Sequence, residues 1–319
     1  MNIENFYRGG APLKYKNLKY TYNVIGFSLI IFLTLRESLS LLLAHTPLEK
    51  GTVPFTLISM AVYLLACFVP VVVMENMLGL HPLLFKKTKP ADAAATAAFG
   101  YLIILGAGII NSIVLMLLAN AGLQFEPNSM TLPQGFLNVL LYFVYICVLP
   151  PLVEEIFVRG LVLNALKGWG LPFAVFVSSV IFALMHSSLH NFLIYFACGI
   201  VLAKVYIAFD SIWPCVLLHF VNNTVSFVQL GFQQKANAQS ALFFSIYIYI
   251  MAMLLGYAGF KYIQKHNINL AFSFTRIRDF KYKIKSLCQS YAGICAFALA
   301  NLALPGDQPF SIEGLHPQN

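Results

Sequence analysis

The stretch FLNVLLYFVYICVLPPLVEEIFVRGLVLNAL, residues 136–166, decides the fold class of this chain. It is apolar for long enough to cross a bilayer, since a helix of about 20 residues spans the hydrocarbon layer. Its second half nevertheless holds two carboxylates and an arginine. Ionisable side chains are costly inside a membrane and by default indicate a functional site. The stretch therefore predicts a membrane helix that contributes to such a site.

The rest of the chain has the same apolar character. Of its 319 residues, 59% are hydrophobic and 10% are charged. Soluble domains carry about 25% charged residues, so this composition excludes an ordinary soluble domain. We predict an all-α, polytopic membrane protein with about eight transmembrane helices, at residues 22–45, 53–78, 92–121, 135–166, 171–188, 190–209, 211–231 and 240–263.

The distribution of charge predicts the orientation. We expect a cytoplasmic N-terminal flank (1–21), a transmembrane domain (22–263) and a basic, partly apolar tail (264–319). With the N-terminus inside, most of the 20 Lys and Arg fall on the cytoplasmic side, as the positive-inside rule requires. Both termini are therefore expected in the cytoplasm, and the basic charge is expected to face an anionic leaflet rather than nucleic acid. For residues 287–304 an interfacial tail is favoured over a ninth span.

The fourth span combines a proline pair with adjacent acids. Pro150 and Pro151 lack backbone donors and are expected to kink or break the helix. Glu155 and Arg159 lie four residues apart and can pair on one face. Glu154 points about 100° away and has no partner within its own helix. This arrangement favours Glu155 with Arg159 as a buried structural pair, and Glu154 as an unpaired, desolvated general base.

Two further groups occur at one-turn spacing. Phe182 and His186 end the fifth span, and His219 and Asn223 lie in the seventh. A His–Asn pair offers two neutral hydrogen-bond donors, which suits an oxyanion hole. A water held between Glu154 and a histidine could then attack a carbonyl. No Ser or Cys stands in a comparable relation to a base, which disfavours a covalent nucleophile.

Other interpretations of buried charge stay open at this point. Carboxylates and histidines inside a membrane also form proton relays in transporters, and a lone histidine can serve helix packing. A transporter is expected to show two pseudo-symmetric halves, and the sequence has no evident internal repeat. Arg36 and Glu37 are sequence neighbours and are not expected to face one another on a helix.

Taken in order, the three groups resemble the signature of a known family. They are similar to the triple motif of the CPBP (Abi) family, which comprises the type II CAAX prenyl endopeptidases and bacterial proteins linked to bacteriocin processing and self-immunity. PPLVEEIFVRGLV resembles the first motif, and ACGIVLAKVYIAFDSIWPCVLLHFVNN resembles the run into the third. The resemblance covers roughly residues 135–230, which are expected to hold the protease motifs.

The resemblance implies an eight-helix intramembrane protease with a conical active-site cavity walled by the later helices. It implies a multi-pass protein of a bacterial plasma membrane that cleaves a hydrophobic or lipidated peptide, either a prenylated CAAX type or a leader or bacteriocin type. The implied catalytic residues are Glu154 and His186, which would activate water, and His219 and Asn223, which would position the carbonyl or stabilise its oxyanion. The implied supporting residues are Glu155, Arg159 and Phe182.

The cofactor and the activity leave alternatives. The family is described both as metal-dependent and as a metal-free glutamate protease. This sequence lacks HExxH and has no free carboxylate to support a zinc site, so no cofactor is favoured. A divalent metal such as zinc is the alternative, with Glu154, His186 and His219 as ligands. A non-proteolytic bacteriocin self-immunity or scaffold protein is the second function considered, and a proton-coupled transporter is the third.

Overall fold

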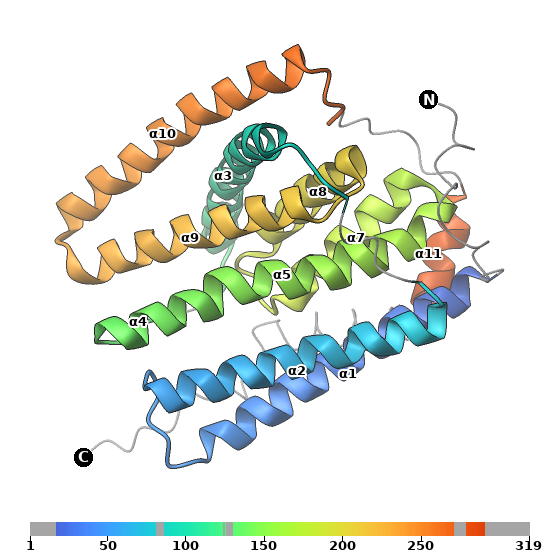
Figure 1. Cartoon of the computed structure of the whole chain (residues 1–319), viewed down its shortest axis with the longest axis horizontal. Coiled ribbons are helices and arrows are strands. Elements are labelled where there is room, and N and C mark those ends of the chain that lie inside the picture. Colours follow the sequence, from blue (N-terminus) through green and yellow to red (C-terminus); the bar gives the residue numbers. More distant parts are fainter. Residues whose placement is uncertain (1–16, 81–85, 124, 126–129, 271–278, 291–319) are drawn as a thin grey trace.

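The computed structural model describes residues 17–80, 86–123, 125, 130–270 and 279–290, and every regular element in these ranges is a helix (Figure 1). The long helices are α1 (Leu18–Ala44), α2 (Val53–Leu78), α3 (Pro90–Asn120), α8 (Phe192–Phe209), α9 (Trp213–Lys235) and α10 (Ala238–Lys265). Shorter ones are α7 (Leu171–Met185) and α11 (Phe280–Cys288). One composite helix runs through α4 (Phe136–Phe143), η2 (Val144–Val148), α5 (Leu149–Glu155), η3 (Ile156–Leu163), α6 (Asn164–Leu166) and η4 (Lys167–Trp169).

These helices confirm the predicted polytopic membrane fold. Seven helices of the described residues are long and apolar enough to cross a membrane, and α7 is a shorter apolar helix. Large apolar side chains such as Leu42 and Phe68 lie 66% and 65% exposed on the outer surface. Such exposure suits a protein whose surrounding solvent is lipid. The predicted span ends agree with the observed helix ends to within a few residues.

The composite helix does not break at Pro150 and Pro151, although a break was one of the two outcomes expected from the sequence. It is continuous from α4 to η4, with π-helical stretches at η2 and η3 on either side of α5. The widened π turn places the backbone N–H of Leu149 on the carbonyl of Val144, which a proline N could not do. The chain thus accommodates the prolines by a local change of register. Glu154 and Glu155 end the short α-helical segment between the two π stretches, a setting that is frequent at functional sites.

The hairpin of α7 and α8 ends inside the bundle. The 15 residues of α7 span only about 22 Å, less than the roughly 30 Å of the hydrocarbon layer. His186 follows α7 directly and lies 3.8 Å from Glu154, so the short helix leaves it level with the middle of the composite helix. Asn111 of α3 donates a 2.9 Å hydrogen bond to the carbonyl of His190, which ties the turn between α7 and α8 to a neighbouring helix.

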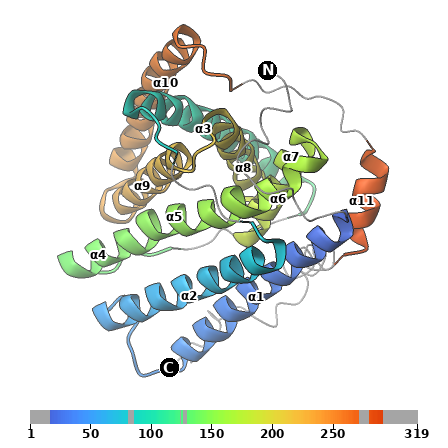
Figure 2. The ribbon, with the colours of Figure 1, turned by 45° about the vertical axis from the view of Figure 1, so that its right-hand side comes forward.

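Close helix contacts depend on small residues. Helix α8 packs on α7, α3 and α9, and α10 packs on α3 (Figure 2). A Cβ added to Gly199 of α8 would lie 2.8 Å from the Cα of Ser179 on α7. On α10, a Cβ at Gly259 would overlap the carbonyl oxygen of Ala95 on α3. Glycine is therefore required where these helix backbones approach most closely.

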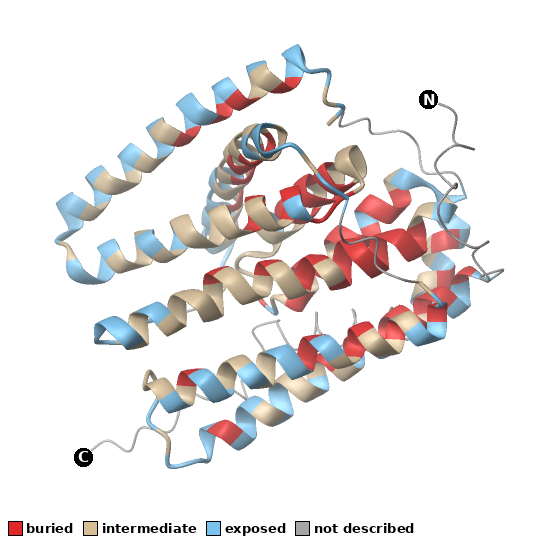
Figure 3. Ribbon diagram, in the orientation of Figure 1, coloured by how far each residue is buried: buried red, intermediate tan, exposed pale blue. Residues whose placement is uncertain are grey.

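One end of the molecule is more tightly packed than the other. Buried residues gather toward the end that holds α6 and α11, and exposed ones toward the end that holds the start of α4 (Figure 3). The packed end is also the basic end. There Lys283 of α11 donates to the carbonyl of Trp169 at 2.6 Å, and Lys86 lies 3.6 Å from Asp210. Helix α11 falls in the predicted basic tail, residues 264–319. Of the weak apolar stretch 287–304, residues 291–304 lie outside the described residues.

Candidate active site

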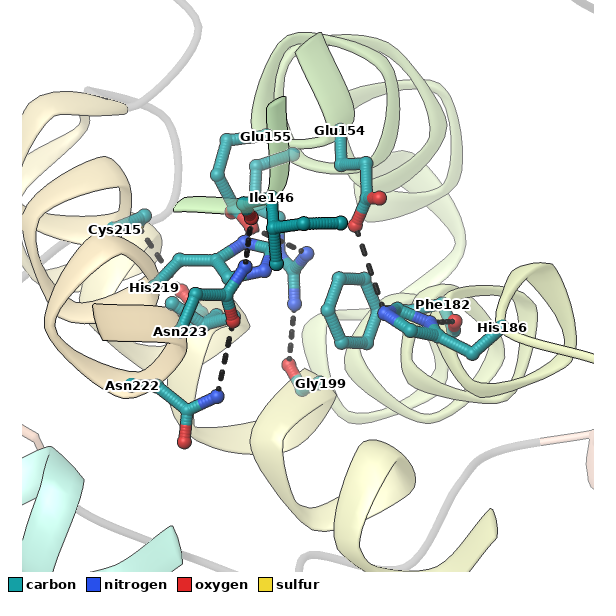
Figure 4. Close-up of polar contacts among 12 residues, drawn as sticks. Ile146, Glu154, Glu155, Phe182, His186, Gly199, Cys215, His219, Asn222 and Asn223 are labelled. Carbon is teal, nitrogen blue, oxygen red and sulfur yellow. Dashed lines mark hydrogen bonds and ion pairs between the residues drawn. The ribbon is translucent and has the colours of Figure 1, made fainter. Parts of the chain in front are cut away.

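The fold brings the three motif groups together around α5 (Figure 4). Helix α5 contributes Glu154 and Glu155, and η3 contributes Arg159. The last turn of α7 contributes Phe182 and is capped by His186. Helix α9 contributes His219 and Asn223.

Glu155 is the centre of a fully buried ionic cluster. Its Oε1 lies 3.0 Å from Nη1 of Arg159, and both side chains are 0% exposed, so the predicted pair is present. Arg159 also donates from Nη2 to the carbonyl of Gly199 at 3.1 Å. Its guanidinium stacks over the ring of Phe182, with Cζ 4.5 Å from the ring centre. A planar guanidinium can make all three contacts at once, and it thereby joins η3, α7 and α8.

Glu155 has a second partner that the sequence did not indicate. Nδ1 of His219 lies 3.0 Å from the same Oε1. An ionised carboxylate only accepts hydrogen bonds, so Nδ1 must carry the proton. The other nitrogen of a neutral His219 is then an acceptor. The expectation that His219 serves as a neutral donor is therefore not met by this geometry, and His219 donates from Nε2 only as an imidazolium.

Glu154 is not unpaired, contrary to the sequence-based expectation. The phenol of Tyr63 on α2 donates a 2.6 Å hydrogen bond to its Oε1. Its Oε2 lies 3.8 Å from Nε2 of His186. This Oε2 is buried and has no hydrogen-bond partner. Tyr63 is the site residue that the motifs missed, because it lies 91 positions away in an ordinary apolar span.

His186 is held in a defined tautomer and orientation. Its Nδ1 lies 2.8 Å from the carbonyl oxygen of Phe182 and must donate to it. A neutral His186 therefore presents the lone pair of Nε2 to Oε2 of Glu154. The ring also stacks on Tyr195, with ring centres 4.0 Å apart. Two acceptors face each other here at a distance too long for a direct hydrogen bond.

Arg36 of α1 supports the same corner of the site. It donates from Nη1 to the carbonyl of Met185 at 2.8 Å and from Nη2 to Oγ of Ser187 at 3.0 Å. It also contacts Oε1 of Glu37 at 2.6 Å, so the expectation that these neighbours do not meet was wrong. The long side chains bend toward each other beyond the helix surface, where the direction of Cβ no longer decides contact. Arg36 thus satisfies the C-terminal end of α7 beside His186.

Asn223 fills a hydrogen-bond position created by the prolines. The carbonyl of Ile146 would accept from residue 150 in an α-helix and from residue 151 in a π-helix, and both are proline. Nδ2 of Asn223 donates to this carbonyl at 3.1 Å. One amide proton of Asn223 is therefore used for packing α9 against η2. The second is the one left for a substrate.

A cavity of about 210 Å³ adjoins this cluster. His186, His219 and Asn223 line it together with Asn222, Tyr195 and other residues of α8 and α9. Glu154 does not line the cavity, but its Oε2 lies 3.8 Å from Nε2 of His186, which does. Asn222, the neighbour of Asn223 on α9, also faces this space and donates to Oδ1 of Asn223 at 3.2 Å.

The candidate metal ligands do not converge. Among the described residues no group of three or more His, Cys, Asp or Glu side chains is placed to hold a metal ion. Glu154 and His186 face each other, but Nδ1 of His219 is directed to Glu155. In this arrangement Glu154, His186 and His219 do not fit a single metal site.

The motif-bearing region of the chain is similar to known proteins. Residues 136–225 match the model of the family described as type II CAAX prenyl endopeptidase Rce1-like. YdiL of Bacillus subtilis (strain 168), named provisionally as a membrane peptidase, is 36% identical over 75 residues, which are 23% of this chain and 31% of YdiL. The membrane-embedded CAAX protease MroQ of Staphylococcus aureus (strain USA300) is 27% identical over 163 residues, which are 48% of this chain and 66% of MroQ.

No solved structure matches the chain. The aligned part of the chain covers less than two thirds of the length of either curated relative. The matched region contains all three motif groups and excludes Arg36 and Tyr63. Through residues 136–225 the chain matches the family of the type II CAAX prenyl endopeptidases, which supports the resemblance of its three motifs to the CPBP family.

Proposed function

We propose that this protein is an intramembrane endopeptidase that hydrolyses a peptide bond in a membrane-associated peptide. The observation that carries the proposal is the 3.8 Å approach of Oε2 of Glu154 to Nε2 of His186. Both atoms are acceptors, and Oε2 is buried without a partner. A water molecule about 2.8 Å from each atom would donate one hydrogen bond to each. Its oxygen lone pair would then be free for attack.

The reaction follows from this placement. Glu154 takes one proton of the water while the water oxygen bonds to the carbonyl carbon of the substrate. The tetrahedral intermediate then loses its C–N bond, and Glu154 returns the proton to the leaving amine nitrogen. The products are a new carboxyl group and a free amine. His186 holds the second proton of the water and keeps it oriented.

The oxyanion has two candidate donors. His219 uses Nδ1 on Glu155 and lines the cavity, so Nε2 is the ring nitrogen left for the substrate. As an imidazolium, His219 would donate from Nε2 to the oxyanion while Nδ1 stays bonded to Glu155, which Arg159 also contacts. The second amide proton of Asn223 is the other donor. Both would act in a buried setting, where such donors are worth most.

The relatives and the location of the site support a substrate class. MroQ is named a CAAX protease, which supports a prenylated CAAX-type peptide, and a leader or bacteriocin-type peptide is the alternative. The buried site supports a hydrophobic or lipidated chain in either case. The clustering of lysines at one end of the bundle supports cytoplasmic termini in a bacterial plasma membrane. A metal-free glutamate mechanism is favoured because the described ligands do not converge.

One experiment tests this proposal. Wild type, Glu154→Gln and Glu75→Gln are purified in detergent, treated with chelator and incubated with hydrophobic and farnesylated peptides, and products are read by mass spectrometry. Wild type and Glu75→Gln are expected to cleave, and Glu154→Gln is expected to fail with an unchanged melting temperature. Cleavage by Glu154→Gln would refute the assignment. Activity that chelation removes and zinc restores would replace the metal-free mechanism with a metal-dependent one.

A non-proteolytic scaffold or self-immunity protein is the second candidate. It is favoured by the number of motif residues that bind the protein itself: Arg159 holds Gly199, and Asn223 holds Ile146. In that case no peptide is cleaved with or without zinc. Substitution at Glu154 would then change the melting temperature and protection of the cell, not catalysis.

A further inference from the structure

A second, larger cavity lies at the end of the molecule opposite the basic end. It measures about 680 Å³ and is bounded by the connection between α1 and α2, the start of α2, residues 130–134 and α4. These elements lie together at the loosely packed end (Figures 1 and 3). Glu49 and Lys50 belong to the lining and lie in the connection between α1 and α2. The two motif histidines do not border this cavity.

The walls of this cavity are polar along two helix faces. Helix α2 and the residue that caps it present Thr52, Thr56 and Ser59, and α4 with η2 presents Asn138, Tyr142 and Tyr145. The spacings of three and four residues place each set on one helix face. Oδ1 of Asn138 is buried and has no hydrogen-bond partner. Polar stripes of this kind inside a membrane protein line water or a polar ligand, and an unpaired amide oxygen suits the N–H of a peptide backbone.

The cavity leads toward Glu154. The ring of Tyr145, which lines it, lies edge-on to the ring of Tyr63 with centres 6.1 Å apart. Tyr63 in turn donates to Glu154. The eleven residues from Thr52 to Tyr63 rise about 16 Å along α2. The part that lines the cavity, Thr52 to Ser59, accounts for about 10 Å of this rise, and an extended chain covers about 3.3 Å per residue, so the α2–α4 groove has room for about three residues.

The opposite end offers no comparable path through the described residues. Between Glu154 and the basic end, η3 and α6 are buried from Phe157 to Leu166, with Leu161, Val162 and Ala165 at 0% exposure. Phe173 and Ala174 of α7 are also fully buried at that end. The groove therefore opens on the face that the charge distribution assigns to the outside of the cell.

We propose that the α2–α4 groove admits an extended segment of the peptide substrate to Glu154 from the extracytoplasmic face of the membrane. The proposal rests on the proposed protease function and adds the route and the side of entry. It makes the substrate a membrane peptide whose scissile bond lies in, or can reach, the outer half of the bilayer. Tyr63 lies one turn beyond the lining residue Ser59 on α2 and donates to Glu154, so it stands between the groove and that carboxylate.

Cysteine labelling tests the route without relying on cleavage. Ser59→Cys and Asn138→Cys are made with Cys288 and Cys295 replaced by serine, because Cys288 is exposed while Cys67, Cys147, Cys198 and Cys215 are buried. Intact cells are treated with a membrane-impermeant sulfonated thiol reagent. Asn120→Cys, at the same end but outside the groove, and Lys19→Cys, at the basic end, are the matched controls. Ser59→Cys, Asn138→Cys and Asn120→Cys are expected to react from outside, and Lys19→Cys only after permeabilisation.

Two further readouts connect the groove to the substrate. A bulky maleimide on Ser59→Cys is expected to reduce cleavage about tenfold or more relative to the same unlabelled variant, while labelled Asn120→Cys keeps its activity. In the Glu154→Gln background, the hydrophobic and farnesylated peptides are expected to slow labelling of Ser59→Cys but not of Asn120→Cys.

The outcomes separate this proposal from the protease assignment. Labelling of the groove cysteines only after permeabilisation, or labelling from outside that peptides do not slow, would overturn the groove proposal. If wild type cleaves nothing but peptides still protect Ser59→Cys, the protease assignment fails and the groove stands as a peptide-binding site. If wild type cleaves and the bulky label has no effect, the substrate reaches Glu154 elsewhere.

Discussion

The hydroxyl of Tyr63 donates to Oε1 of Glu154 at 2.6 Å, and this bond leaves the other carboxylate oxygen facing His186. A tyrosine of α2, outside the region shared with the family model, thus orients the residue proposed as the catalytic base. Hydrogen bonds to a charged carboxylate are short and strong. Without the bond from Tyr63, the carboxylate of Glu154 can rotate. Its Oε2 then faces His186 for only part of the time, and the proposed water between them is held less well.

Tyr63→Phe removes this bond and keeps the ring. A hydrogen bond to a charged group is worth about 1.5–3 kcal/mol, so kcat is expected to fall roughly 10- to 150-fold with a small change in KM. Steady-state cleavage of the best peptide measures it. Tyr101→Phe, at a buried tyrosine of α3, is the control and is expected to cleave normally. An unchanged kcat in Tyr63→Phe would show that Glu154 is oriented by other contacts.

Arg36→Met removes the clamp on the end of α7. The carbonyl of Met185 and the hydroxyl of Ser187 lose their donor, and His186, one residue further along, loses its fixed position. A misplacement of this kind is expected to lower kcat about tenfold or more while KM changes little. Glu37→Gln is the matched control, because Glu37 is largely exposed and a glutamine still accepts from Arg36. Equal losses in the two variants would contradict the clamp.

Asn223 and Pro150 are expected to be energetically coupled. Asn223→Ala leaves the Ile146 carbonyl without its donor, at a cost of about 1–3 kcal/mol. Pro150→Ala restores a backbone N–H that can bond the same carbonyl within the helix. The stability loss from Asn223→Ala, measured as the melting temperature in detergent, should therefore shrink in the Pro150→Ala background. Additive effects in this double-mutant cycle would mean that the prolines do not create the bond.

Gly199→Ala is expected to separate α7 from α8. The added methyl would lie 2.8 Å from the backbone of Ser179, and the shift would also move the carbonyl that Arg159 binds. Overpacking of this kind costs about 1–3 kcal/mol, which should lower the melting temperature and the activity together. Gly106→Ala is the control: nothing lies within 4 Å of its added methyl, and alanine favours a helix by about 1 kcal/mol. An equal melting temperature in both variants would contradict close packing at Gly199.

Local features of the site could be predicted from the sequence. Glu155 and Arg159 meet because residues four apart share a helix face whatever the tertiary structure. The residues of the three motifs could be grouped for the same reason, since each pair lies within one turn. Arg36 could be singled out in the sequence because it is a charged residue inside a predicted span. Its partners could not be inferred, because Met185 and Ser187 lie about 150 positions away.

Contacts between distant segments could not be predicted. Tyr63 looks like any aromatic residue of a membrane helix until α2 packs beside α5. The partner of His219 depends on how α9 is rotated against α5, and that rotation placed Nδ1 on Glu155. The prediction that His219 serves as a neutral donor to the substrate was wrong for this reason. The π-helical stretches likewise needed the structure, since a proline pair predicts a disturbance but not whether the helix breaks or changes register.

Hydropathy alone determined the membrane spans, because burying a run of about 20 apolar residues in lipid is a property of that run and not of its neighbours. Charge alone predicted which end faces the cytoplasm. Only the tertiary structure decided that His186 lies at the depth of Glu154, because that depends on α7 stopping after 15 residues within the bundle. It also decided that Glu154 has a phenol partner and stands beside a groove, because such contacts arise from helix packing, which no single segment specifies.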